Sequence, residues 1–390
     1  GNDVDTFLDR LFLKLNTEVD KEAPAFLEAF PYVNGGLFND TIKSPQFSAK
    51  ARKIILDCGN LNWSEINPDI FGSMIQAVVN PEYRSGLGMH YTSVPNIMKV
   101  IEPLFLNELK EEFEKSKGSS KKLRQLIHRI SKIKVFDPAC GSGNFLIIAY
   151  KELRRLEIEI LQHLNELEAQ VSIVFTQIKL SQFYGIELDD FAHEMAILAL
   201  WLAEHQMNKV FVDELHDFGK AKPILPLKEA GHITQGNATR LDWNTVCPKH
   251  KSDEIYILGN PPYLGARIQE KEHKDDLSIV FKGVKRYKNL DYISCWFYKG
   301  SKYIKDSNSK LAFVTTNSIC QGEQVELLWP NLFNLKLEIS FAHQSFKWTN
   351  NAKGNAGVSV VIIGLRNESN NDKFIYNLSL TKKVNKINAY

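Results

Sequence analysis

Two different spacings of apolar residues divide this sequence. Up to about residue 80, apolar side chains recur at helical spacing, as at Phe7, Leu11 and Leu15, and prolines and glycines divide the region into short elements. From residue 133 on, short β-rich runs alternate with helical patterns. The predicted strands are Ile133–Phe136, Gln182–Ile186, Glu254–Leu258, Leu311–Thr315 and Val358–Leu365, and the predicted helices between them include Asn144–Asn165 and Phe191–Gln206.

Strands that alternate with helices predict an α/β fold. We expect a doubly wound, mostly parallel sheet that binds its ligands at the carboxyl ends of its strands. The expected regions are a helical spacer over residues 1–85, an α/β domain over 86–366, and a tail or the start of a truncated domain over 367–390.

Composition excludes several classes of protein. With 44% hydrophobic and 24% charged residues, and no apolar stretch near the roughly 20 residues that cross a bilayer, the chain is expected to be soluble and cytoplasmic. The five cysteines form no CxxC pair, so we expect neither disulfides nor a metal site. The net charge of +2 does not by itself predict a nucleic-acid partner, and we interpret the basic run Lys115–Lys134 as a solvated face.

The first candidate site is the turn after the first predicted strand, which runs from Asp137 through Pro138, Ala139, Cys140, Gly141, Ser142 and Gly143 to Phe145. Gly141 and Gly143 let the backbone take positive φ angles and approach a ligand closely, and the following helix offers free N–H groups. The third glycine of a dinucleotide-binding turn is missing, and Asp137 would repel a phosphate. The turn therefore indicates a cofactor that carries a cationic amine or a sulfonium.

Two further turns extend this candidate cofactor site. Glu187 ends the second strand, where a carboxylate can accept hydrogen bonds from both hydroxyls of a ribose. Asn237 follows a short apolar run in Gly236-Asn237-Ala238 and can place its amide against the edge of an adenine.

The most specific feature is Asn260-Pro261-Pro262-Tyr263, directly after an apolar strand. The prolines restrict the backbone, so that the Asn260 side-chain oxygen and the Pro261 carbonyl are held as two acceptors. Two acceptors aimed at one NH2 group favour a tetrahedral nitrogen whose lone pair can attack an electrophile. Tyr263 offers a ring on which a flat base can stack after it has been flipped out of a duplex.

Together these residues resemble a known family. The sequence is similar to the amino-methyltransferases of the γ arrangement, and most of all to MmeI-like restriction–modification enzymes. The segments that carry the similarity are, in their order along the chain, Gly88–Ser93, the glycine turn, Tyr184–Asp189, Gly236–Ala238 and Asn260–Tyr263. The resemblance implies a Rossmann-like methyltransferase domain, S-adenosylmethionine as cofactor and double-stranded DNA as partner. It also implies methylation of the N6 amino group of adenine, in the bacterial cytoplasm.

The resemblance further implies roles for individual residues. The implied catalytic residues are Asn260, Pro261, Pro262 and Tyr263, and the residues implied to contact the flipped base are Tyr263 and Phe346. The residues implied to bind the cofactor are His90, Tyr91, Thr92, Asp137, Pro138, Ala139, Gly141, Gly143, Phe145, Glu187, Leu188, Asn237 and Ala238.

The sequence departs from the family's pattern in two places, and alternatives stay open. Ser93 stands where Pro is frequent, and Asn237 stands where Asp is common. Enzymes that methylate a glutamine of protein release factors also use Asn-Pro-Pro-Tyr, and cytosine N4 methylation or a non-catalytic DNA-binding scaffold are further possibilities. Family members carry a nuclease and a target-recognition domain; we identify neither in this sequence and expect both in the full-length chain.

Overall fold

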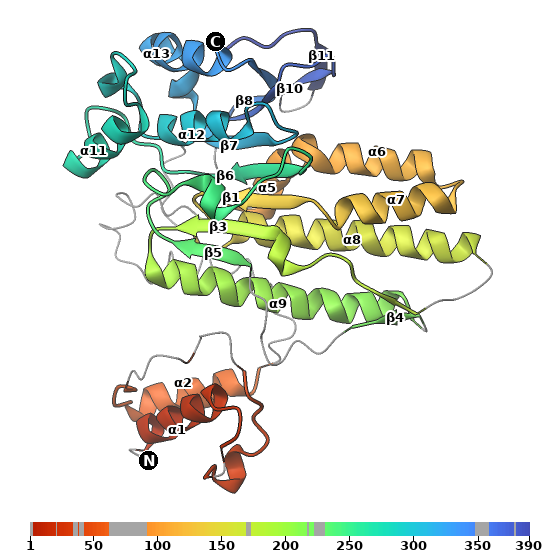
Figure 1. The fold of residues 1–390 in the computed structure, drawn as a ribbon. Helices are drawn as coiled ribbons and strands as arrows, with labels where there is room; N and C mark the ends of the chain where they lie inside the picture. Colours follow the sequence, from red (N-terminus) through yellow and green to blue (C-terminus); the bar gives the residue numbers. More distant parts are fainter. Residues whose placement is uncertain are drawn as a thin grey trace.

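A nine-stranded sheet forms the centre of the fold (Figure 1). The computed structural model describes residues 3–20, 22–33, 38, 43–61, 92–168, 173–216, 218–221, 231–347, 359–377 and 380–390. The strand order is β11-β10-β8-β9-β7-β6-β1-β3-β5, and β2 and β4 form a separate small pair. The strands are β1 (Lys134–Asp137), β2 (Val174–Phe175), β3 (Phe183–Glu187), β4 (Gly219–Lys220), β5 (His232–Gln235), β6 (Ile255–Gly259), β7 (Lys310–Thr316), β8 (Leu337–Lys347), β9 (Ser359–Asn367), β10 (Lys373–Asn377) and β11 (Leu380–Val384).

Strand direction brings many chain segments to one edge of the sheet. Strands β5, β3, β1, β6 and β7 pair in parallel, so their carboxyl ends meet at that edge. Strand β9 is antiparallel to both β7 and β8, which makes β7 and β8 parallel to each other, and β10 pairs in parallel with β8. The carboxyl ends of β8 and β10 therefore lie at the same edge as the turn after β1.

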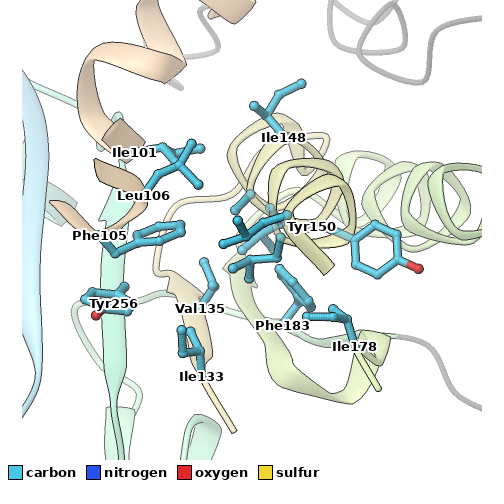
Figure 2. Close-up of a cluster of buried hydrophobic side chains, with 14 of the residues drawn as sticks. Ile101, Phe105, Leu106, Ile133, Val135, Ile148, Tyr150, Ile178, Phe183 and Tyr256 are labelled. Atoms are coloured by element: carbon cyan, nitrogen blue, oxygen red, sulfur yellow. The ribbon is translucent and has the colours of Figure 1, made fainter. Parts of the chain in front are cut away.

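Helices cover both faces of the sheet because side chains of each strand alternate between the faces. Val135, for example, belongs to one buried cluster and its neighbour Phe136 to the other. Figure 2 shows part of the first cluster, where Phe105, Val135 and Phe183 pack between the sheet and its helices. That face carries α5 (Val94–Ile101), the π-helical turn Glu102–Leu106, α6 (Asn107–Ser116), α7 (Ser120–Ile130), α8 (Asn144–Leu167) and α9 (Asp190–Glu214).

The opposite face carries shorter helices. They are α10 (Trp243–Val246), α11 (Lys271–Val280), α12 (Ser294–Ile304) and α13 (Gly322–Phe333), and their apolar residues form the second cluster. Short 3-10 turns lie at Leu180–Gln182, Tyr287–Asn289 and Asn317–Cys320. Near the amino terminus, α1 (Val4–Asn16), the 3-10 turn Ala25–Leu27 and α2 (Ala49–Gly59) lie apart from the sheet in Figure 1.

The predicted α/β fold with a mostly parallel sheet is confirmed, and each predicted strand lies within a residue or two of its observed position. Residues 373–377 and 380–384, which the sequence analysis placed in the tail, form β10 and β11 and extend this same sheet. No helix among the described residues is long and apolar enough to span a bilayer.

The basic run between Lys115 and Lys134 contributes ion pairs to the fold. Arg129 contacts Glu254 at 2.6 Å, Lys134 contacts Asp253 at 2.7 Å, and Arg124 contacts Glu168 at 2.6 Å. These acids come from distant parts of the chain, so much of the charge of this run is compensated within the structure rather than offered to a phosphate backbone.

Candidate active site

Most of the predicted site residues that the structure describes lie at the carboxyl edge of four neighbouring strands, in the order β6-β1-β3-β5. Phe136 pairs with Ile257, Asp137 with Gly185, and Glu187 with Gln235. This register places the glycine turn between the Asn-Pro-Pro-Tyr loop on one side and Glu187 on the other. Asn237 follows β5 at the far end of the row.

The glycine turn needs its glycines for two different reasons. Gly143 caps the amino terminus of helix α8 at a φ of +83°, and a Cβ there would lie 3.3 Å from the Cβ of Ala196. Gly141 has a φ of +54° and faces open space, since a Cβ would meet nothing within 4 Å. The turn is fixed from the other face of the sheet, where the Trp296 indole donates a hydrogen bond of 3.0 Å to the Pro138 carbonyl. The result is a rigid turn with room beside it for a ligand.

Asp137 is fully buried at the base of this turn. Its Oδ1 accepts the Ala139 N–H at 3.0 Å, but its Oδ2 has no hydrogen-bond partner among the described residues. Burial raises the pKa of Asp137 to about 8, and the nearby charge of Glu187 adds to the effect. The side-chain oxygens of Asn144 and Asn260 are also buried without a partner in the described chain. Buried polar atoms of this kind need a hydrogen-bond partner, which a ligand bound at this turn can supply.

Glu187 links the second strand to the glycine turn. Its carboxylate accepts the N–H of Gly141 at 2.7 Å and the N–H of Asp189 at 3.0 Å. Burial raises its pKa, while these backbone bonds act in the opposite direction. Next to it, the Leu188 side chain is 55% exposed and offers an apolar surface beside Glu187.

We expect Glu187→Ala to weaken S-adenosylmethionine binding by about 1.5–3 kcal/mol, because the ribose hydroxyls would lose charge-assisted hydrogen bonds. Calorimetric titration of the folded variant measures this loss. The exposed neighbour Asp190 provides the control, since Asp190→Ala should bind with parental affinity. Unchanged affinity in Glu187→Ala would overturn the assignment.

A second prediction concerns pH. Without cofactor, Asp137 keeps its proton up to about pH 8, whereas in the unfolded chain it ionises near its ordinary pKa of 3.8. The contribution of Asp137 to the free energy of unfolding therefore declines as the pH rises from about 3.8 to about 8. A cationic ligand favours the ionised form, so cofactor binding should release protons and tighten between about pH 6 and pH 7.5. Titrations in buffers of different ionisation enthalpy measure this release, and Asp137→Asn should abolish it.

The Asn-Pro-Pro-Tyr loop follows β6 and is held just beyond Tyr263. Asp291 accepts the Leu264 N–H at 2.9 Å, and the Leu264 carbonyl accepts the Tyr292 N–H at 3.0 Å and the Gln269 amide at 2.8 Å. Burial raises the pKa of Tyr263 to about 12, and the Asp291 charge contributes. The Tyr263 phenol is therefore neutral at physiological pH, and its ring packs against the second buried cluster.

Phe346 lies near the end of β8, at the same edge of the sheet. Phe346 and Thr316 of β7 flank the same residue of β9, Val360. The β8 and β6 backbones are about 14 Å apart, or three strand spacings. The centre of the Phe346 ring is 5.3 Å from the Lys99 ammonium and 6.4 Å from the centre of the His343 ring. The contact of Phe346 with a flipped base remains a prediction.

Of the remaining predicted residues, four lie in the described part of the chain and two lie outside it. Thr92 is buried just before α5, Phe145 and Ala238 are buried, and Asn237 donates to Asp276 at 2.9 Å. His90 and Tyr91 lie outside the described residues. No group of three His, Cys, Asp or Glu side chains within the described part of the chain is placed to hold a metal ion.

Sequence reasoning missed the residues that support the site. Trp296 contacts the glycine turn, which lies about 160 residues earlier in the sequence. Asp291 contacts the end of the Asn-Pro-Pro-Tyr loop, about 30 residues earlier. One signal was available: Asp291 lies between Leu290 and Tyr292-Ile293, and an acid inside an apolar run is seldom buried without hydrogen-bond partners.

Comparison with known proteins agrees with this geometry. Residues 113–377 match the family described as the MmeI DNA-methyltransferase domain. The chain belongs to this family. It is 53% identical over 392 aligned residues to DNA methyltransferase A of Bacillus subtilis (strain 168), and the alignment covers 100% of the chain and 44% of that protein.

Solved structures give the same result. The chain superposes on the Type IIL restriction–modification enzyme MmeI in complex with DNA, with a TM-score of 0.90 and 42% sequence identity, over 100% of this chain and 53% of MmeI. The type IIG restriction endonuclease BpuSI shares the fold at a TM-score of 0.51 and 12% identity, over 96% of this chain and 38% of that one. The chain thus spans about half the length of DNA methyltransferase A and of MmeI.

Proposed function

We propose that this chain transfers a methyl group from S-adenosylmethionine to the N6 amino group of adenine in double-stranded DNA, as the modification part of a restriction–modification enzyme. The observation that carries the proposal is the buried Asn260 side-chain oxygen, which has no donor among the described residues and follows a strand adjacent to Asp137. An acceptor next to a cofactor turn fits the NH2 group of a substrate. Membership of the MmeI methyltransferase family supports the same reaction.

The residues present fit the cofactor. Asp137 would hold its amino group, Glu187 its ribose and Asn237 its adenine, while Gly141 leaves room for the methionine part. When bound, S-adenosylmethionine supplies an electrophilic methyl group on a positively charged sulfur. Because that sulfur is already a good leaving group, the protein needs to provide alignment and hydrogen bonding rather than a strong base.

Asn260 and Pro261 would activate the substrate amine. The lone pair of an adenine NH2 group is delocalised into the ring, which makes the nitrogen a poor nucleophile. Hydrogen bonds from both amine protons, to the Asn260 Oδ1 and the Pro261 carbonyl, favour a tetrahedral nitrogen with a localised lone pair. The fixed loop at Leu264 keeps both acceptors in place before the substrate arrives.

The base would reach this site by flipping out of the duplex, since an adenine in the helical stack cannot enter a pocket at a sheet edge. Tyr263 would stack on the flipped base, an interaction worth about 1–3 kcal/mol. We assign Phe346 to the same base pocket, on its outer side.

Methylation of a release-factor glutamine requires the same acceptors, but no comparison favours it, and the similarity to MmeI extends over the whole chain. A methyl-transfer assay with tritiated S-adenosylmethionine, offering duplex DNA, RNA and release factor together, separates the alternatives. We expect label in DNA alone. Label in the release factor, or cofactor binding without transfer to any substrate, would contradict the proposal.

The chain is proposed to act within a longer protein that also carries nuclease and target-recognition domains, and this leads to a prediction about DNA binding. By itself the chain should bind duplex DNA weakly and with little sequence preference, because phosphate contacts would dominate. We expect the affinity to fall by about 100-fold or more between roughly 50 and 200 mM salt. Fluorescence anisotropy measures this dependence; tight, sequence-selective binding at physiological salt would place the recognition function within these residues.

A further inference from the structure

A buried carboxylate outside the predicted site connects its two halves. Asp276 on α11 is 2% exposed and accepts three side-chain hydrogen bonds. Its Oδ2 accepts from the Asn237 amide at 2.9 Å and from the Tyr292 hydroxyl at 2.7 Å, and its Oδ1 accepts from the Arg240 guanidinium at 2.7 Å. Three donors around one carboxylate keep it ionised in a buried place.

These contacts determine which way the Asn237 amide faces. An ionised carboxylate can only accept, so the nitrogen of the amide must face Asp276. The oxygen is fixed independently, since it accepts the Thr239 N–H at 2.9 Å and the Thr239 hydroxyl at 2.6 Å. Asp276 takes one of the two hydrogens on the amide nitrogen. What Asn237 can offer a ligand is therefore the second N–H, a donor suited to a ring nitrogen of adenine.

The same carboxylate supports the loop that would carry the chemistry. Tyr292 donates its hydroxyl to Asp276 and its backbone N–H to the Leu264 carbonyl. Leu264 directly follows Tyr263, and its own N–H is held by Asp291. Two hydrogen bonds that share the Asp276 carboxylate thus join the turn at Asn237 to the segment that fixes the Asn-Pro-Pro-Tyr loop.

We propose that Asp276 is a positioning residue for both halves of the site: it presents Asn237 as an N–H donor to a ring nitrogen of the cofactor adenine, and through Tyr292 it fixes the loop after Tyr263. This role rests on the proposed function, because it requires S-adenosylmethionine at the glycine turn. Asp276 itself touches neither cofactor nor substrate in this arrangement.

Exchanging Asn237 and Asp276 in the full-length enzyme tests whether Asp276 presents Asn237 as a donor to the cofactor. Asn237→Asp would place two carboxylates in contact and should lower both the melting temperature and the affinity for S-adenosylmethionine. In the double variant Asn237→Asp with Asp276→Asn, the hydrogen bond between positions 237 and 276 re-forms in the opposite sense, and the same amide can donate its second hydrogen to the Tyr292 hydroxyl. The melting temperature of the double variant should therefore rise above that of Asn237→Asp. Its affinity should stay about tenfold weaker than parental, because residue 237 no longer has an N–H to donate.

Tyr292→Phe tests the second half, since it removes only the hydroxyl. We expect kcat for methyl transfer to fall about tenfold while the affinity for the cofactor stays within about twofold. Asp275→Asn, an exposed neighbour on the same helix, is the matched control and should leave both quantities at the parental value.

The outcomes separate this inference from the proposed function. If the exchanged pair recovers cofactor affinity together with stability, the Asn237 donor is not used and the inference fails. A parental kcat in Tyr292→Phe would equally overturn the link to the loop. In both cases the parental enzyme still binds cofactor and methylates DNA, whereas a parental enzyme that binds no S-adenosylmethionine would refute the proposed function itself.

Discussion

Replacing Asn260 by alanine is expected to lower the rate of methyl transfer by about 100- to 1,000-fold, the usual cost of losing one preorganised hydrogen-bonding partner. The Asn260 oxygen is buried and has no partner among the described residues, so it is available to the substrate amine. Its hydrogen bond strengthens as the nitrogen becomes tetrahedral, so the loss falls on turnover rather than on binding. Single-turnover kinetics and cofactor calorimetry on the full-length enzyme measure the two quantities separately.

Two variants serve as comparisons. Asn244 is exposed and lies on helix α10, outside the loop, so Asn244→Ala should methylate at the parental rate. Tyr263→Ala should reduce both the capture of the flipped base and the rate, because it removes the stacking surface. Parental turnover in Asn260→Ala would mean that Asn-Pro-Pro-Tyr is only a structural turn.

Gly259→Ala is expected to abolish measurable cofactor binding. Gly259 has a φ of +151°, a conformation that L side chains rarely adopt, and a Cβ there would lie 2.5 Å from the Asp137 Oδ1. The substitution therefore strains the backbone before Asn260 and displaces the carboxylate proposed to hold the cofactor amine. Backbone strain and overpacking each typically cost about 1–3 kcal/mol, so the melting temperature should fall as well.

Gly265→Ala is the matched control for this substitution. Gly265 lies just beyond the same loop, and a Cβ there would meet nothing within 4 Å. Thermal denaturation and calorimetry should find Gly265→Ala close to the parental protein. If Gly259→Ala binds S-adenosylmethionine as tightly as Gly265→Ala does, the close packing of β6 against Asp137 does not shape the cofactor site.

The sequence predicted those parts of the fold that depend on local pattern. Apolar runs at β1, β3 and β6 end in Asp137, Glu187 and the residue before Asn260, and parallel pairing then necessarily brings those ends together. For this reason the candidate site could be assembled before the order of the strands was known. Positive φ angles at Gly141 and Gly143 were also predictable, since only the turn between strand and helix had to be recognised.

Other features depend on contacts between distant segments and could not be predicted in this way. Strands β10 and β11 are half-exposed or exposed and contain three lysines, so their composition is typical of a tail. Pairing with β8 stabilises β10, and pairing with β10 stabilises β11. The Asp276 contacts likewise join helix α11 to the turn at Asn237 and to Tyr292, which are 39 and 16 residues away in sequence. Local pattern identifies a polar residue in such a place but not its partner.

The measurement that tests the central claim most directly is the chemical position of the transferred methyl group. The full-length enzyme would be incubated with duplex DNA and S-adenosylmethionine carrying a labelled methyl group, and the DNA digested to nucleosides and analysed by mass spectrometry. Two acceptors aimed at an adenine NH2 group predict the label in N6-methyladenine, and its disappearance in Asn260→Ala. Label in N4-methylcytosine, or its absence from DNA while the enzyme binds the cofactor, would contradict the account.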